Sequence, residues 1–140
     1  TLNAKRDRFE KKLLREGIAR RIPILGVCRG MQMIADFFGL KIEKVNSHAG
    51  TKHYVEIAKG NCLFPFYGRR HKVNSYHRYG ILSPVKPLTA LAISIKDSCV
   101  ESIYHKELNI AGIMWHPERE APYSRSDISF FRSFFGGRKG

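Results

Sequence analysis

Apolar residues at helical spacing and short continuous apolar runs alternate along the first part of the chain. Residues 4–20 predict an amphipathic helix, with an apolar face of Phe9, Leu13, Leu14 and Ile18. Residues 22–27 form a continuous apolar run, which is typical of a strand covered on both faces. A second helix is predicted over residues 31–38, because Gly39 follows as a good C-terminal residue. This order indicates an α/β chain.

The rest of the chain is predicted to be mainly strand. Strands are expected at residues 41–44, 53–58, 71–75, 89–95, 99–105 and 110–115, with a loop-rich stretch over residues 60–70. Ser124 or Ser126 can cap a last helix, whose apolar face consists of Ile128, Phe131, Phe134 and Phe135. No repeat or linker interrupts the pattern. We therefore expect a single domain over residues 1–140, with a layered, mostly parallel sheet flanked by helices.

The junction between the first strand and the second helix carries the strongest chemical signal. It reads Gly26-Val27-Cys28-Arg29-Gly30, a cysteine between two glycines in a turn tight enough to need both. A strand–turn–helix elbow of this kind presents a nucleophile at the C-terminal end of its strand. The helix N-terminus favours negative charge, so we expect it to lower the thiol pKa. A cysteine in an apolar run is otherwise a small buried hydrophobe.

A thiolate nucleophile needs a base, and the base needs an orienting group. The segment Trp115-His116-Pro117-Glu118 follows the apolar run 110–114, so His116 is expected where a second buried strand ends. That carboxyl edge is where open α/β sheets bind ligands. Glu118 can hold the imidazole in the tautomer that accepts a thiol proton. The chain therefore predicts a triad of Cys28, His116 and Glu118; a strand-end histidine beside a solvated glutamate is the alternative.

Other histidines are weaker candidates. His77 is a rival base, which we discount because the sequence places no orienting carboxylate next to it. His48 and His53 flank a predicted strand start at a spacing that matches no common metal site, so we expect no metal. His71 and His105 have no special context.

The chain is strongly basic, with a formal net charge of +13. Such a charge favours phosphate-bearing partners, nucleic acids among them. The basic residues are scattered over residues 5–21, 69–72 and 138–139, and no nucleic-acid motif accompanies them. We therefore expect a solvated basic surface and no nucleic-acid function. One or two arginines at the mouth of the site would suffice to bind a phosphate on a small substrate.

Cysteine usage and hydropathy bear on location. The apolar runs are far shorter than the roughly 20 residues that a membrane helix needs, so we expect no membrane partner. Cys28, Cys62 and Cys99 form neither a zinc pattern nor a disulfide framework. A reducing, cytoplasmic location fits this usage, with structural roles for Cys62 and Cys99.

Taken together, residues 26–32 and 115–118 resemble the class I glutamine amidotransferase superfamily. Residues 6–10, the Cys-Arg-Gly form and the Val-Asn-Ser-Tyr-His segment at 73–77 are similar to its γ-glutamyl hydrolase branch. Within that branch, residues 5–12 and 22–34 resemble hydrolases that act on a CDP-linked γ-glutamyl amide in capsule biosynthesis. The likeness runs over residues 5–135 and implies a flavodoxin-like fold without a metal or organic cofactor. Superfamily members have strands and a glycine-rich oxyanion loop before the first helix, so we expect an N-terminally incomplete domain.

The resemblance implies further roles around the triad. Gln32 lies one helical turn after Cys28 and would contact the γ-glutamyl group, unless it is a solvent-facing helix residue. The backbone N–H of Arg29 is an expected oxyanion donor. Its side chain would pair with a substrate carboxylate or, alternatively, with Glu10. Tyr76 and His77 would border the glutamyl pocket.

Three functions follow from these patterns. The leading one is cysteine-dependent hydrolysis of a γ-glutamyl amide, in which a thioester forms on the nucleophile and glutamate is released. A glutaminase that supplies ammonia to a synthetase partner is the first alternative. A non-catalytic binding module on the same fold is the second. All three triad positions are intact, which favours an enzyme.

Overall fold

The computed structural model describes residues 4–45, 49–77, 79–82 and 84–136, arranged around one curled sheet. Helices are α1 (Ala4–Ala19), α2 (Arg29–Phe37), α3 (Phe64–Tyr67) and α4 (Arg125–Gly136), and a 3₁₀ turn covers Pro117–Arg119. Strands are β1 (Ile24–Val27), β2 (Ile42–Lys44), β3 (Ala49–Glu56), β4 (Arg70–Tyr76), β5 (Tyr79–Ile81), β6 (Thr89–Ser94), β7 (Val100–His105) and β8 (Ile110–Ile113). His48, Arg78 and the basic residues 138–139 lie outside the described residues.

The strands pair in the order β1-β8-β7-β6-β3-β4, and β5 pairs with both β2 and β7. The predicted α/β class is confirmed. Among the described strands, however, only β1 and β8 pair in parallel, so the expectation of a mostly parallel sheet is wrong for them. Parallel neighbours need a crossover of about a dozen residues or more. The links at 95–99 and 106–109 are too short for one.

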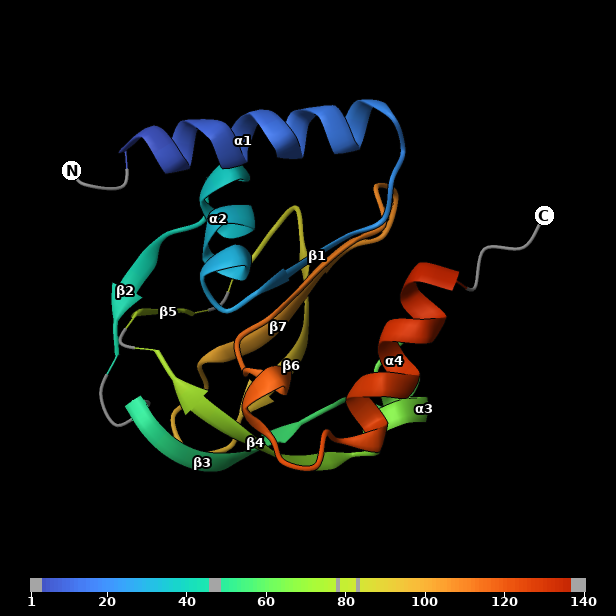
Figure 1. The fold of residues 1–140 in the computed structure, drawn as a ribbon. Coiled ribbons are helices and arrows are strands. Elements are labelled where there is room, and N and C mark those ends of the chain that lie inside the picture. The colour runs from blue at the N-terminus through green and yellow to red at the C-terminus, as the bar shows by residue number, and fades with distance from the viewer. Residues whose placement is uncertain (1–3, 46–48, 78, 83, 137–140) are drawn as a thin grey trace.

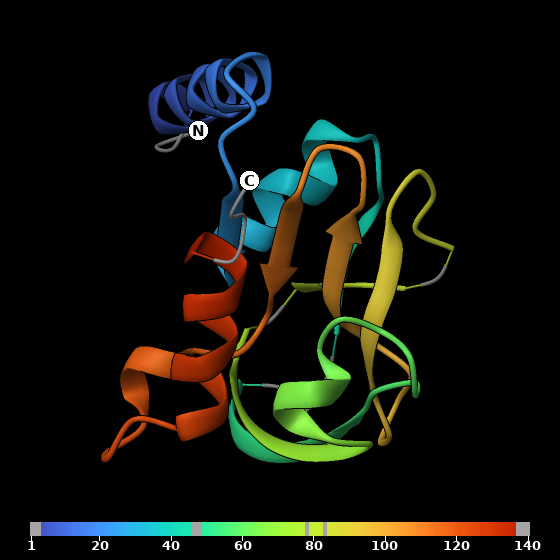
Figure 2. The ribbon, with the colours of Figure 1, turned by 90° about the vertical axis from the view of Figure 1, so that its right-hand side faces the viewer.

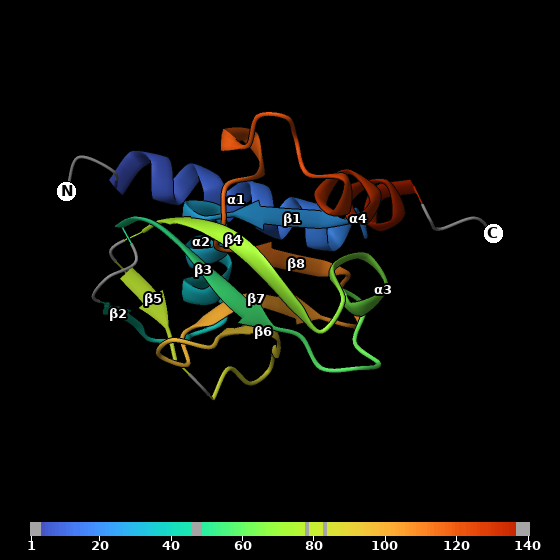
Figure 3. The ribbon, with the colours of Figure 1, turned by 90° about the horizontal axis from the view of Figure 1, so that it is seen from below.

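Helices cover both faces of the sheet. On one face α1 lies across α2 (Figure 1), and Leu14, Met31 and Ile34 pack there with Ile103 and Ile110. On the other face α3 and α4 lie next to each other (Figure 3), in a second core formed by Val55, Leu63, Tyr67, Trp115 and Phe130. Adjacent residues of β8 alternate between the two cores, as a strand requires. In Figure 2, β6 to β8 run upright and the β3–β4 hairpin crosses below them.

Most predicted elements are present, and three were not foreseen. The sequence missed α3, β5 and the 3₁₀ turn, and β3 begins before the predicted residue 53. Ser124 caps α4, because its Oγ accepts a hydrogen bond from the Asp127 N–H at 3.4 Å. On α4 the unpredicted Phe130 is buried, whereas Ile128 and Phe135 are exposed. None of the described helices combines the length and apolar character that a bilayer crossing requires.

Two glycines in register allow α2 to approach the sheet closely. Gly26 of β1 pairs with Gly112 of β8. A Cβ on Gly26 would lie 2.5 Å from the Gly30 backbone, and one on Gly112 would lie 2.7 Å from the side chain of Met31. A Cβ on Gly30 would meet nothing within 4 Å. The elbow therefore requires glycine on the strand side alone, which corrects the expectation that both glycines are needed.

Alanine substitutions separate these two positions. We expect Gly26→Ala to lower the free energy of unfolding by about 1–3 kcal/mol, because the added methyl group meets backbone atoms of α2 that cannot move aside. Gly30→Ala is the matched control. It should be neutral or stabilising by up to about 1 kcal/mol, since alanine is the better helix former. Urea unfolding of both variants is the measurement, and equal stabilities would contradict the steric account.

Candidate active site

Cys28 occupies a strained turn between β1 and α2. Its backbone has φ 53° and ψ −102°, a conformation that L-residues rarely adopt. Two hydrogen bonds hold it there: the Cys28 N–H donates to the Ile113 carbonyl at 2.7 Å, and the Gln32 N–H donates to the Cys28 carbonyl at 3.1 Å. The first bond ties the turn to β8, and the second begins α2. The predicted elbow geometry is confirmed, while its chemical role stays a prediction.

The thiol of Cys28 is half-buried, and its pKa lies above the ordinary value of 9.0. Burial raises the pKa most, and the charges of Glu118 and Glu101 raise it further. A hydrogen bond from the Arg29 backbone N–H and the charge of Arg119 lower it without offsetting burial. The expectation of a lowered thiol pKa is therefore wrong for the free protein. Forming a thiolate here requires a base.

His116 and Glu118 form a close pair just beyond β8. The His116 Nδ1 lies 2.6 Å from Glu118 Oε2, and because a carboxylate only accepts, Nδ1 is the donor. The other ring nitrogen, Nε2, is then the one that can accept a proton. Burial slightly raises the pKa of Glu118, but the hydrogen bond and charge of His116 and the charge of Arg119 hold it below its usual value. Glu118 is thus a carboxylate at neutral pH.

The parallel pairing of β1 with β8 brings these groups to one edge of the sheet. Val27 is in register with Ile113, so Cys28 and the segment that follows β8 leave the sheet at the same end. The contacts of the described residues include no hydrogen bond between Cys28 Sγ and His116. Catalytic hydrogen bonds of this kind often tighten only when substrate is bound.

Gln32 and His77 meet at a backbone carbonyl of β5. The Gln32 amide donates to the Tyr79 carbonyl at 3.0 Å, and His77 Nδ1 donates to the same oxygen at 2.9 Å. The His77 Nε2 lies 3.5 Å from Glu101 Oε2. An orienting carboxylate for His77 does exist, so the reason for discounting it as a base was wrong. Both of its ring nitrogens instead face protein groups in the interior, where it is 4% exposed.

Glu101 is a fully buried carboxylate shared by two histidines. Besides His77, its partner is His53, whose Nε2 lies 3.3 Å from Oε1. Burial raises the pKa of Glu101, but the hydrogen bonds and charges of both imidazoles outweigh burial, so the pKa is lowered. Within the described residues no group of three or more His, Cys, Asp or Glu side chains is arranged to hold a metal ion.

Tyr76 and Arg119 stack beside the proposed base. The Tyr76 ring meets the His116 ring edge-on, with centroids 5.7 Å apart. The guanidinium of Arg119 lies 4.2 Å from the centre of the Tyr76 ring. No ion pair of Arg119 with a carboxylate occurs in the described part of the chain. Arg119 therefore keeps a positive charge next to the triad positions.

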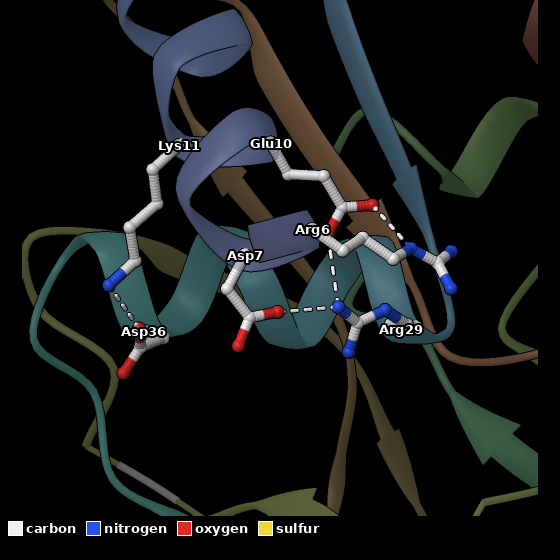
Figure 4. A network of polar contacts seen from close by, with 6 residues as sticks. All are labelled: Arg6, Asp7, Glu10, Lys11, Arg29 and Asp36. Carbon is white, nitrogen blue, oxygen red and sulfur yellow. Dashed lines mark hydrogen bonds and ion pairs between the residues drawn. The ribbon is translucent and has the colours of Figure 1, made fainter. Parts of the chain in front are cut away.

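The Arg29 side chain points away from the candidate site and onto α1 (Figure 4). Its Nη2 lies 2.5 Å from Asp7 Oδ1 and 3.2 Å from Glu10 Oε1. Lys11 of α1 forms a second link to α2, at 2.9 Å from Asp36 Oδ2. The internal pairing with Glu10 is thus the alternative that the structure favours, and we assign no substrate carboxylate to this guanidinium.

Sequence reasoning missed Asn74, Glu101 and Arg119. Glu101 had a readable signal, because a carboxylate in the apolar strand 100–103 demands a buried partner. Asn74 had a weaker one, since asparagine is disfavoured in strands. Arg119 had no signal beyond its place after Glu118. Cys62, expected to be structural, is exposed, whereas Cys99 is buried.

Comparisons with known proteins agree on the family. The Peptidase C26 family pattern matches residues 1–118. The chain is 39% identical over 119 residues to the γ-glutamyl-CDP-amidate hydrolase of Campylobacter jejuni, covering 85% of this chain and 54% of that protein. It is 37% identical over 98 residues to the glutamine-hydrolysing subunit of GMP synthase from Methanosphaera stadtmanae, covering 69% of this chain and 52% of that protein.

A solved structure shares the fold. The crystal structure of a glutamine amidotransferase from Thermotoga maritima superposes with a TM-score of 0.71 at 22% identity, covering 90% of this chain and 54% of that one. The chain thus spans about half the length of the relatives it matches. The fold is that of glutamine amidotransferases, as the sequence resemblance implied.

The raised thiol pKa has a direct chemical consequence. A pKa above 9.0 leaves less than about 1% of Cys28 as thiolate at pH 7, and the fraction grows as the pH rises. We therefore expect the rate of iodoacetamide alkylation at Cys28 to increase throughout the range from about pH 6 to pH 9, without a plateau. Mass spectrometry of the Cys28 peptide measures this rate, with a free cysteine peptide as the reference. A plateau below about pH 8 would show that the thiolate is stabilised in the free protein.

Proposed function

The chain belongs to the Peptidase C26 family of glutamine amidotransferase-type proteins, and on that premise we propose that it hydrolyses a γ-glutamyl amide bond through a cysteine thioester. One observation carries the proposal. A cysteine in a strained strand–helix turn and a histidine paired with a carboxylate at 2.6 Å leave the same end of two parallel, adjacent strands. These are the parts that nucleophilic acyl transfer needs.

In the proposed reaction the thiol proton of Cys28 passes to His116 Nε2 as the sulfur attacks the γ-carbonyl carbon. The backbone N–H of Arg29, which already points at the sulfur, donates to the oxyanion that forms. His116 then gives its proton to the leaving nitrogen, and a thioester remains on Cys28. Water, deprotonated by His116, hydrolyses the thioester and releases glutamate. Glu118 keeps Nδ1 protonated throughout and stabilises the imidazolium.

We further propose that the leaving group is anionic and nucleotide-linked. The hydrolase from Campylobacter jejuni, whose name specifies a γ-glutamyl-CDP-amidate, supports this class of substrate. Arg119 supports it independently, because its charge acts on Cys28 and is not neutralised by a carboxylate in the described part of the chain. An arginine held on an aromatic ring is well suited to a phosphate oxygen.

Removing the nucleophile tests the reaction. With γ-glutamyl-CDP-amidate as substrate, we expect Cys28→Ala in the full-length protein to lower the rate of glutamate release by at least about 10³-fold. Cys62→Ser is the matched control, because this exposed thiol lies outside the candidate site and its loss should leave the rate unchanged. Glutamate is measured by a coupled dehydrogenase assay. Equal rates for Cys28→Ala and the unmodified protein would refute the mechanism.

Free glutamine, assayed side by side, separates the proposal from its alternative. A protein named as glutamine-hydrolysing is among the relatives, which favours a glutaminase as the second candidate. Faster release from glutamine than from the nucleotide-linked amide would establish that alternative. No release from either substrate, in a folded protein, would favour a non-catalytic module.

Arg119 offers a test of the leaving group. We expect Arg119→Gln to lower kcat/KM for γ-glutamyl-CDP-amidate relative to γ-glutamyl-p-nitroanilide by about 10- to 100-fold, the effect of one charge-assisted hydrogen bond. The ratio is the readout, because any effect on the pKa of Cys28 applies to both substrates. Arg70→Gln, at the far end of β4 from Tyr76, is the control. An unchanged ratio would remove Arg119 from substrate recognition.

A further inference from the structure

One buried side chain holds both peptide groups that flank the side chain of His116. Asn74, on β4, is 2% exposed. Its Oδ1 accepts a hydrogen bond from the His116 N–H at 2.7 Å, and its Nδ2 donates to the His116 carbonyl at 2.8 Å. Nδ2 also donates to Glu120 Oε2 at 2.8 Å. Asn74 thus uses its acceptor and its amino group at the same time.

This pairing fixes the direction in which the His116 side chain leaves the backbone. His116 is extended, with φ −110° and ψ 94°, and is followed by a proline whose φ is restricted. It lies beyond the last residue of β8, so no strand partner sets its peptide orientation. With the N–H and the carbonyl both bonded to Asn74, the Cα–Cβ vector is set by β4. Glu118 then fixes only the rotation of the ring.

Only asparagine or a larger amide can make this set of bonds. Aspartate has no N–H to donate to the His116 carbonyl, and a hydroxyl is too short to reach two peptide groups. The bond to Glu120, itself 3.7 Å from Lys52 Nζ, determines which way the Asn74 amide faces.

We propose that Asn74 is the positioning residue of the candidate base, holding the His116 imidazole at the distance from Cys28 that proton transfer requires. The inference rests on the proposed function, because it gives His116 a proton to move. A displacement of about 1 Å in such a group costs about 10²-fold in rate. Asn74 acts through His116 and touches no reacting atom.

The test compares two asparagines that bridge backbone groups in the same way. Asn61 donates to the Leu91 carbonyl at 2.7 Å and accepts from the Leu63 N–H at 2.8 Å, away from the candidate site. We expect Asn74→Ala to lower kcat for glutamate release from γ-glutamyl-CDP-amidate by about 10²-fold with KM unchanged. Asn61→Ala should leave kcat unchanged, although it removes the same kinds of bond. Equal kcat values for folded Asn74→Ala and the unmodified protein would overturn the inference.

A readout that needs no activity separates this inference from the proposed function. Proton NMR of the unmodified protein should show a strongly downfield Nδ1–H of His116, from its short bond to Glu118. The signal should shift or broaden in Asn74→Ala and persist in Asn61→Ala. If neither protein releases glutamate, the proposed function fails, and this signal alone decides the role of Asn74.

A second variant covers the case in which Asn74→Ala does not fold. The double variant Asn74→Asp with Glu120→Gln keeps the size and net charge of the cluster and allows the acceptor bond to the His116 N–H. It lacks the donor for the His116 carbonyl. We expect it to fold with a kcat that remains at least about 10-fold low, since one of the two peptide bonds to His116 is missing. Full kcat in this variant would refute the positioning role.

Discussion

The candidate site depends on how closely α2 can approach the sheet. Gly26 and Gly112 are register partners on neighbouring strands, so they face the same way and leave a patch of sheet without side chains. The backbone of α2 at Gly30 and the side chain of Met31 fill this patch. With the helix so close, the chain has too little room for a relaxed turn, and Cys28 takes a positive φ. The strain at the nucleophile is a consequence of the packing beneath it.

Magnitudes explain why the thiol pKa is raised although Cys28 precedes a helix. A helix N-terminus stabilises an adjacent charge by about 0.3–1 kcal/mol, less than the roughly 1.4 kcal/mol of one pKa unit. Burial can shift a pKa by several units. Desolvation therefore dominates at Cys28, and two nearby carboxylates, Glu118 and Glu101, act in the same direction. A neutral thiol at rest makes the His116–Glu118 pair essential to the proposed chemistry and not merely helpful.

The sequence predicted what local pattern controls and failed where distant residues decide. The elbow around Cys28 and the His116–Glu118 pair are each contained in a few adjacent residues, so spacing and residue type were enough to find them. Strand direction, the partner of Arg29 and the carboxylate beside His77 depend on how the sheet curls, which no local pattern records. Whether the two halves of the candidate triad act together likewise stays a prediction. The four-residue helix α3 is too short for periodicity to predict.

The base segment takes its geometry from a single stretch of chain, residues 64–76. Beyond β8 it has little regular structure, yet Asn74 bonds the backbone of His116 and Tyr76 packs against its ring. Trp115 Nε1 donates to the buried Asp127 of α4 at 3.1 Å, and Tyr67 of α3 donates to the same oxygen at 2.5 Å. The nucleophile is positioned by α2 and two glycines, and the base by α3 and β4. Because these two supports share only the parallel pair β1 and β8, a change in either one can misalign the candidate site while leaving the other intact.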